Sequence, residues 1–145
     1  MSSPDPNPLG GPTPNRGALI LVVERNPIVQ RLERYFLEQA GFSVELASDG
    51  LAALARVREL RPQILVTEIL VPKLDGLSLC RTIKSTPETK DMLVMIFSHL
   101  QAEDRAYEAG ADAFLTKPLD EQFLIQTVET LLGSRKQSAG DRSNG

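Results

Sequence analysis

The sequence predicts an open α/β sheet of five parallel strands wound between five helices. Short apolar runs alternate along the chain with stretches of helical periodicity, and three of these runs are apolar enough to be buried on both faces of a sheet. The 145 residues suit one domain, and a hydrophobic content of 41% is sufficient for a core. We therefore expect a single doubly wound domain.

The two ends of the chain differ in composition from the middle. Residues 1–17 contain five prolines and three glycines, which favour extended chain without a face that can pack. Residues 133–145 are polar and lack hydrophobic periodicity. We predict a disordered tail at 1–17, a folded domain at 18–132 and a flexible polar tail at 133–145.

The predicted strands cover residues 18–23, 43–46, 64–67, 93–97 and 113–116. Between the first two strands, Asn26 can cap a helix, Pro27 occupies the favoured first position and Gly41 ends the helix. In this helix we expect Ile28, Leu32, Phe36 and Ala40 to face the sheet, and Arg31 and Arg34 to face water.

Four further helices follow from similar signals. One begins near Asp49 and stops before Pro62, and the next runs from 76 to 84 after a turn at Asp75. A short helix covers 102–109, and Asp120 caps the last helix. The predicted inner residues of the last helix are Phe123, Leu124, Val128 and Leu131.

Composition excludes several classes of function. The net charge of -3 and the pI near 5.2 provide no broad basic surface for nucleic acid, so the expected partners are proteins. Cys80 is the one cysteine, so it forms no internal disulfide and is expected to be a packing residue. No apolar run approaches the roughly 20 residues of a membrane span, and the expected location is the cytoplasm.

Polar residues follow four of the predicted strands where each strand ends. They are Glu24 with Arg25, Glu68, Ser98, and Lys117 followed by Pro118. In open α/β sheets, ligands bind at the carboxyl ends of the strands beside the point where the strand order reverses. We therefore expect these side chains to meet in one pocket.

Five segments in this order resemble the successive motifs of bacterial response-regulator receiver domains, over about residues 18–132. The segments are ALILVVERNP, GFSVELASDGLAAL, RPQILVTEILVPKLDG, LVMIFSHL and GADAFLTKP. The resemblance implies a flavodoxin-like fold with strand order 2-1-3-4-5, a role in two-component phosphorelay signalling, and a cis peptide before Pro118.

A working receiver has two acidic residues after its first strand and an aspartate after its third, which together hold Mg²⁺ and accept a phosphoryl group. This sequence departs from that pattern at two positions, because Arg25 replaces one acid and Glu68 replaces the acceptor aspartate. Ser98, Lys117 and Phe114 match the family's hydroxyl, lysine and switch aromatic. The resemblance thus implies a degenerate receiver, a pseudo-receiver.

These substitutions act against metal binding and phosphoryl transfer. Mg²⁺ takes hard oxygen ligands, and Arg25 offers none, so no cofactor is expected beyond weak Mg²⁺ binding at Glu24 and Glu68. We expect Arg25 to pair with Glu24 or Glu68 instead. The extra methylene of Glu68 moves its carboxylate outward by about 1.5 Å, which places it near Ser98 and Lys117 as a partial phosphate mimic.

His99 follows Ser98, at a position where receivers usually carry a small residue. It is either an exposed polar loop residue or a cover over the pocket with a role as a lid or pH sensor. Ser98 has no partner at a spacing that would make it a nucleophile.

Three functions remain open from the sequence. The first is a non-enzymatic module that binds a protein partner, such as a histidine kinase or an effector domain, through residues 102–109, 113–116 and the helix after Asp120. The second is a phosphoacceptor with altered geometry. The third is an oligomerisation module of a longer regulator, which would form a homodimer.

Overall fold

The structure is a computed structural model that describes residues 17–144, so the tail expected at 1–17 lies outside the described residues apart from Gly17. Five parallel strands form one sheet in the order β2-β1-β3-β4-β5. This confirms the flavodoxin-like order. The strands are β1 (Leu19–Val23), β2 (Ser43–Ala47), β3 (Ile64–Thr67), β4 (Leu93–Ser98) and β5 (Ala113–Thr116).

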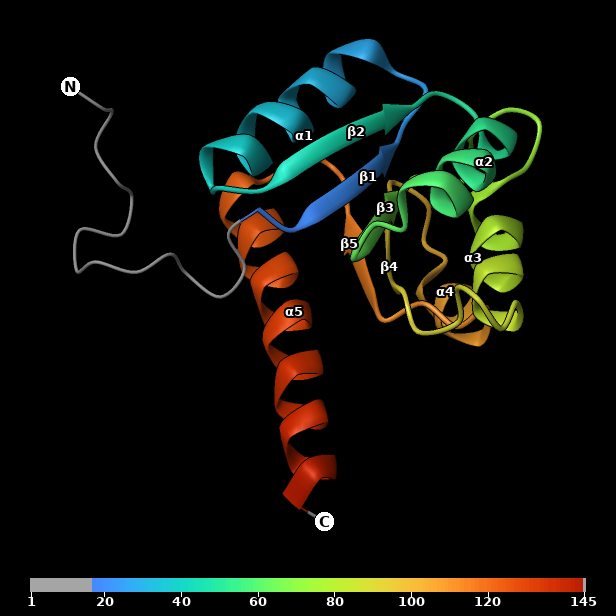
Figure 1. Cartoon of the computed structure of the whole chain (residues 1–145). Helices are drawn as coiled ribbons and strands as arrows, with labels where there is room; N and C mark the ends of the chain where they lie inside the picture. Colours follow the sequence, from blue (N-terminus) through green and yellow to red (C-terminus); the bar gives the residue numbers. More distant parts are fainter. Residues whose placement is uncertain (1–16, 145) are drawn as a thin grey trace, which may run out of the picture.

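Helices cover both faces of the sheet. Figure 1 shows α1 and α5 on one face, and α2, α3 and α4 on the other. The helices are α1 (Pro27–Gln39), α2 (Gly50–Leu60), α3 (Gly76–Ser85), α4 (Glu103–Glu108) and α5 (Glu121–Asn144). None of the helices in the described part of the chain is long and apolar enough to cross a membrane.

The central strands hold the core together because both of their faces are covered. Every residue of β3 and β4 is buried, and so are four of the five in β1. Alternate side chains of these strands enter two apolar clusters, one on each face of the sheet. The rigid centre therefore fixes the carboxyl ends of β1, β3 and β4, where the polar residues lie.

Side-chain caps set the starts of four helices, and the sequence predicted two of these caps, at Asn26 and Asp120. Asn26 accepts a hydrogen bond from the Ile28 N–H at 2.9 Å. The remaining three caps make the same kind of contact: Asp49 with Ala52, Asp75 with Ser78 and Asp120 with Phe123, at 2.7, 2.9 and 3.0 Å. Each cap satisfies an N–H group that has no partner within its helix.

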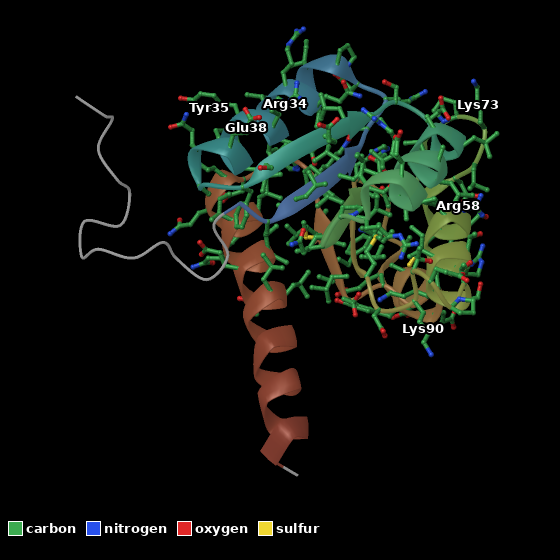
Figure 2. All side chains as sticks on the ribbon, in the orientation of Figure 1. Arg34, Tyr35, Glu38, Arg58, Lys73 and Lys90 are labelled. Atoms are coloured by element: carbon green, nitrogen blue, oxygen red, sulfur yellow. The ribbon has the colours of Figure 1, made fainter. Side chains whose placement is uncertain are left out.

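The expected inner face of α1 is wrong by one position. Ile28 and Leu32 are 61% and 42% exposed, whereas Glu33 and Leu37 are buried. Figure 2 shows Tyr35 and Glu38 on the outer side of the same helix. Of the remaining residues of the expected stripe, Phe36 is half-buried and Ala40 is exposed. Arg31 faces water as expected, whereas Arg34 is half-buried. The error arises because Glu33 reads as a surface residue, since carboxylates are rarely buried.

The last helix also differs from expectation in two respects. Phe123 is 61% exposed, although Leu124 and Val128 are fully buried as predicted. The helix is also longer than predicted, because it extends to Asn144; the flexibility of residues 133–145 stays a prediction. No proline follows Pro118, so every residue of this stretch retains the backbone N–H that a helix uses.

Candidate functional site

A lysine joins two buried carboxylates at the carboxyl edge of the sheet. The Lys117 Nζ lies 2.8 Å from an oxygen of Glu24 and 2.9 Å from an oxygen of Glu68. Glu24 follows β1, Glu68 follows β3 and Lys117 follows β5, so three separate strand ends supply the cluster. The site predicted from the sequence is thus assembled around one ammonium group.

Lys117 is held from more than one side. Its Nζ also lies 5.4 Å from the centre of the Phe97 ring, within the range of a cation–π contact. Burial lowers its pKa, but the hydrogen bonds to Glu24 and Glu68 outweigh this, and the pKa of Lys117 lies above its ordinary value of 10.5. The lysine therefore remains charged at neutral pH.

Glu68 uses both of its carboxylate oxygens within the protein. One oxygen accepts from the Ile69 N–H at 2.7 Å, and the other accepts from Lys117. Burial by itself raises the pKa of Glu68, but hydrogen bonds from Ser98, Lys117 and the Ile69 backbone bring it below the ordinary 4.5. Glu68 is therefore an anion whose charge is already compensated.

The loop after β3 packs so closely that one position requires glycine. A Cβ placed on Gly76 would lie 2.2 Å from the carbonyl oxygen of Glu68. The Gly76 N–H donates to the Ile69 carbonyl at 2.8 Å, which ties the start of α3 to the end of β3. This contact fixes the backbone from which Glu68 projects.

Arg25 does not take the place expected for it. Its side chain is exposed, and among the described residues no salt bridge joins it to Glu24 or Glu68. Lys117 makes both pairs instead. The reason is position: Glu24, the residue after β1, turns into the pocket, and the next residue along an extended backbone points the opposite way.

His99 lies at the mouth of the pocket. Its Nδ1 is 3.8 Å from an oxygen of Glu68, while the side chain remains 61% exposed. This geometry fits both predictions for His99, an exposed loop residue and a side chain that covers the pocket. The Ser98 hydroxyl beneath it is fully buried and also accepts from the Leu100 N–H at 3.1 Å.

The remaining sequence-predicted positions are arranged around this cluster. Phe114 is half-buried and packs against the apolar cluster on the α2, α3 and α4 face. The peptide between Lys117 and Pro118 is cis, as the resemblance implied. Cys80 is buried away from the site, and burial raises the pKa of its thiol to about 11, which agrees with a packing role.

Sequence reasoning missed Glu33, a third carboxyl group beside this cluster. Glu33 is 1% exposed, and its Oε1 has no hydrogen-bond partner in the described structure. Helical side chains tilt toward the N-terminus of their helix, and the N-terminus of α1 lies at the pocket. Burial, with a further contribution from the charge of Glu24, raises the pKa of Glu33 well above 4.5, although Lys117 opposes this.

The two carboxylates that could hold a divalent cation, Glu24 and Glu68, already share a cationic partner. Within the described part of the chain, no group of three or more His, Cys, Asp or Glu side chains is placed to hold a metal ion. One oxygen of Glu24 and one oxygen of Glu68 bind the Lys117 ammonium. Mg²⁺ would have to displace this ammonium from both carboxylates.

Comparison with known proteins identifies the family. The family model described as the response regulator receiver domain matches residues 20–129 of the sequence. The chain belongs to this family. Two curated relatives are the response regulator MprA of Mycobacterium leprae, 38% identical over 118 residues (81% of this chain, 52% of the relative), and the DNA-binding dual master transcriptional regulator RpaA of Synechocystis, 32% identical over 116 residues (78% and 48%).

Solved receivers share the same fold. The receiver domain of the sensor histidine kinase PA1611 from Pseudomonas aeruginosa, described with a magnesium ion in its active-site cleft, has a TM-score of 0.75 at 27% identity and covers 81% of this chain and 98% of that one. The receiver of a histidine kinase from Syntrophus aciditrophicus has a TM-score of 0.76 at 30% identity, with 81% and 92% covered. The present receiver spans about half the length of the curated relatives it matches.

Proposed function

We propose that this receiver domain acts in two-component signalling by binding a protein partner without being phosphorylated. The observation that carries the proposal is the position of Lys117, which binds Glu24 and Glu68 at 2.8 and 2.9 Å. The three groups together carry one negative charge, and a cation or a phosphoryl donor would have to compete with Lys117 for both carboxylates. The role is one of binding and not of catalysis.

The two substituted positions support this proposal in different ways. Arg25 points to solvent and supplies no metal ligand. Glu68 has a longer side chain than the aspartate of working receivers, and in-line phosphoryl transfer depends on alignment at the scale of about one C–C bond. Neither metal binding nor attack on phosphorus is therefore favoured.

Glu68 also supports a permanent signalling state. Its carboxylate receives hydrogen bonds from Ser98 and Lys117, the two side chains that match the family's hydroxyl and lysine. A phosphoryl group on an acceptor aspartate would carry nearly two charges, whereas Glu68 carries one. We infer that Glu68 occupies the contacts of a phosphoryl group in part, independently of any kinase.

The proposed partner surface comprises α4, β5 and α5. Phe114 lies in β5 and Lys117 directly follows this strand, so β5 joins the cluster to the surface. Phe123, on the first turn of α5, is exposed on it. A partner bound here would sense the state of the carboxylate and lysine cluster.

The test compares divalent-cation binding by the natural chain and by the double variant R25D/E68D, with calorimetry at neutral pH. We expect Mg²⁺ to bind the double variant at least tenfold more tightly, because R25D adds a carboxylate ligand and E68D restores the aspartate of working receivers. The single variant R31D is the matched control, since Arg31 is an exposed arginine of α1 outside the site. Equal Mg²⁺ affinity in the natural chain and the double variant would contradict the proposal.

A further inference from the structure

Strand β5 forms an edge of the sheet, and its outer side is open to pairing. β5 pairs only with β4 among the described strands. The Lys117 N–H donates to the Ser98 carbonyl at 2.9 Å, and the main-chain groups of successive residues in a strand point to opposite edges. The N–H and C=O groups of Thr116 and, by the same alternation, of Phe114 therefore point away from the sheet.

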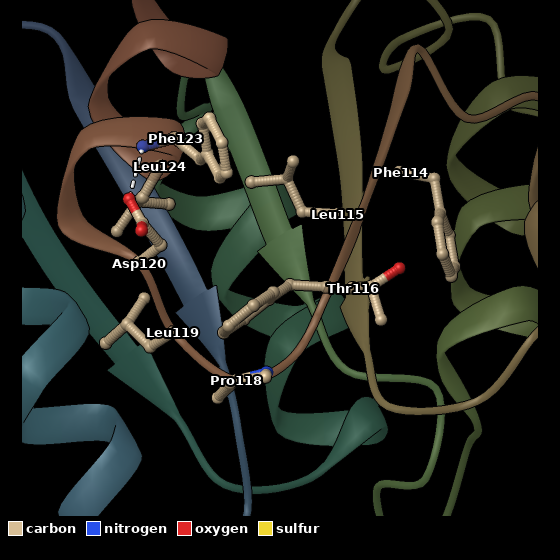
Figure 3. Close-up of a pocket in the computed structure, with 9 residues that line it drawn as sticks. Phe114, Leu115, Thr116, Pro118, Leu119, Asp120, Phe123 and Leu124 are labelled. Carbon is tan, nitrogen blue, oxygen red and sulfur yellow. Dashed lines mark hydrogen bonds between the residues drawn. The ribbon is translucent and has the colours of Figure 1, made fainter.

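Two pockets lie on opposite faces of this strand. The α5-side pocket has a volume of about 290 Å³ and is lined mainly by apolar residues, including Phe97, Leu115, Leu119 and Phe123. Asp120 is its one charged lining residue, and Phe114 and Thr116 line both pockets. Figure 3 shows Leu115 directed toward α5, with Phe114 and Thr116 on the opposite side of the strand. Successive side chains of an added strand would alternate between the two faces in the same way.

The α4-side pocket has a different chemistry. It has a volume of about 520 Å³, and its lining includes Glu103, Asp104 and Arg105 from α4 with Phe114 and Thr116 from β5. The three α4 side chains are exposed, and they give this pocket a net negative charge. A basic side chain therefore complements it, whereas an acidic one meets two carboxylates.

We propose that β5 binds an extended segment of a protein partner as a sixth strand, with aliphatic side chains in the α5-side pocket and basic side chains in the α4-side pocket. Backbone hydrogen bonds to Phe114 and Thr116 supply the pairing, and the alternation of apolar and basic side chains supplies specificity. This inference rests on the proposed binding function and names the partner segment that the α4, β5 and α5 surface recognises.

Neighbouring features agree with this mode of binding. Phe123 forms a wall of the α5-side pocket, yet 61% of its surface is exposed. An aliphatic side chain in that pocket would cover part of the ring. The Phe97 ring is shared between the pocket and the cation–π contact with Lys117, so the bound segment also contacts a residue that touches the carboxylate and lysine cluster.

The experiment uses a fluorescein-labelled peptide of three alternating valine and lysine pairs, titrated with the full chain and followed by fluorescence anisotropy. Two further peptides serve as comparisons: one replaces lysine by glutamate, and one carries N-methyl groups on alternate residues so that one edge cannot form hydrogen bonds. We expect both changes to weaken binding at least tenfold. Backbone NMR should show shifts at the amides of Phe114 and Thr116.

Two charge-reversal variants of α4 provide a matched pair. Asp104 lines the pocket, whereas Glu108 is an exposed carboxylate of the same helix that does not line it. We expect D104K to weaken binding of the valine and lysine peptide at least fivefold and E108K to change it less than twofold. Both residues are exposed, so neither variant should impair folding.

Three results would overturn the inference: no binding at about 1 mM protein, equal binding of the N-methylated peptide, or equal effects of D104K and E108K. Amide shifts at β5 that grow with protein concentration alone would assign the edge to a second copy of the chain. Phosphoryl uptake from acetyl phosphate would defeat the proposed function and leave peptide binding untouched, so the two failures are distinguishable.

Discussion

Glu33 should make the folded receiver lose stability as the pH rises. The residue is 1% exposed, and burial raises its pKa in the folded protein well above the ordinary 4.5. Below the ordinary pKa, both the folded and the unfolded chain hold the proton, and its effect on stability is nil. Above it, the unfolded chain releases the proton first, so unfolding is favoured.

The magnitude follows from proton linkage. Each pH unit between the ordinary pKa and the folded-state pKa of Glu33 should lower the free energy of unfolding by about 1.4 kcal/mol. The other shifted groups act in other ranges. Glu68, with a lowered pKa, loses its contribution as the pH falls below its ordinary 4.5, and Lys117, with a raised pKa, loses its contribution above 10.5. The range from about pH 5 to 9 therefore isolates Glu33 among them.

The assay is chemical denaturation of the natural chain, E33Q and E33L at several pH values in this range. Circular dichroism is the suitable signal, because the chain contains no tryptophan. The free energy of unfolding of both variants should equal or exceed that of the natural chain, and the difference should widen as the pH rises. E33L should gain a further 1 to 3 kcal/mol, roughly the cost of one unpaired buried polar group, at every pH.

Parallel stability curves for the natural chain and E33Q across this range would refute the reasoning. That result would mean that Glu33 ionises normally in the folded protein, and that the unpaired Oε1 has access to solvent or to a cation. A third outcome would give the folded-state pKa itself. If the curves diverge and then become parallel, the pH at which they do so gives the folded-state pKa of Glu33.

Three further predictions concern the packing that supports the site. G76A should destabilise the chain by about 1 to 3 kcal/mol, because its methyl group would lie 2.2 Å from the Glu68 carbonyl oxygen. G133A should stabilise it by up to about 1 kcal/mol, because no atom lies within 4 Å of the added Cβ and alanine favours a helix. Thermal unfolding of both variants checks this. K117M should lower the free energy of unfolding by about 3 to 5 kcal/mol at pH 7, because it leaves two buried carboxylates uncompensated. A loss of the same size at pH 4 would contradict a stabilising role of the ion pairs. L124A should cost about 2 to 5 kcal/mol and F123S less than about 0.5 kcal/mol in urea unfolding, since Leu124 is buried and Phe123 is exposed; similar losses would contradict the assigned face of α5.

The strands and caps were predictable because their signals are local. Asn26 and Asp120 mark helix starts by their own hydrogen bonds, and the apolar runs of β3 and β4 permit no exposed face. The residues at the strand ends could be gathered into one pocket because parallel strands end at the same edge. These inferences needed no knowledge of tertiary packing.

The errors arose where tertiary contacts overrule a local pattern. The apolar spacing of Ile28 and Leu32 favours one face of α1, yet the sheet contacts the adjacent face that carries Glu33. Arg25 has the right charge to pair with Glu68, but its side chain points away from the pocket. Lys117, which follows β5 far along the chain, pairs with Glu68 instead. Neither burial of a carboxyl group nor the choice between two cations is encoded in a short window of sequence.

The most direct test of the proposed function is intact-mass spectrometry after incubation with Mg²⁺ and acetyl phosphate. The natural chain is compared with R25D/E68D, which restores the acidic residue and the acceptor aspartate of working receivers. We predict one phosphoryl adduct on the double variant and none on the natural chain. A Mg²⁺-dependent adduct on the natural chain would contradict signalling by binding alone and would make this receiver a phosphoacceptor.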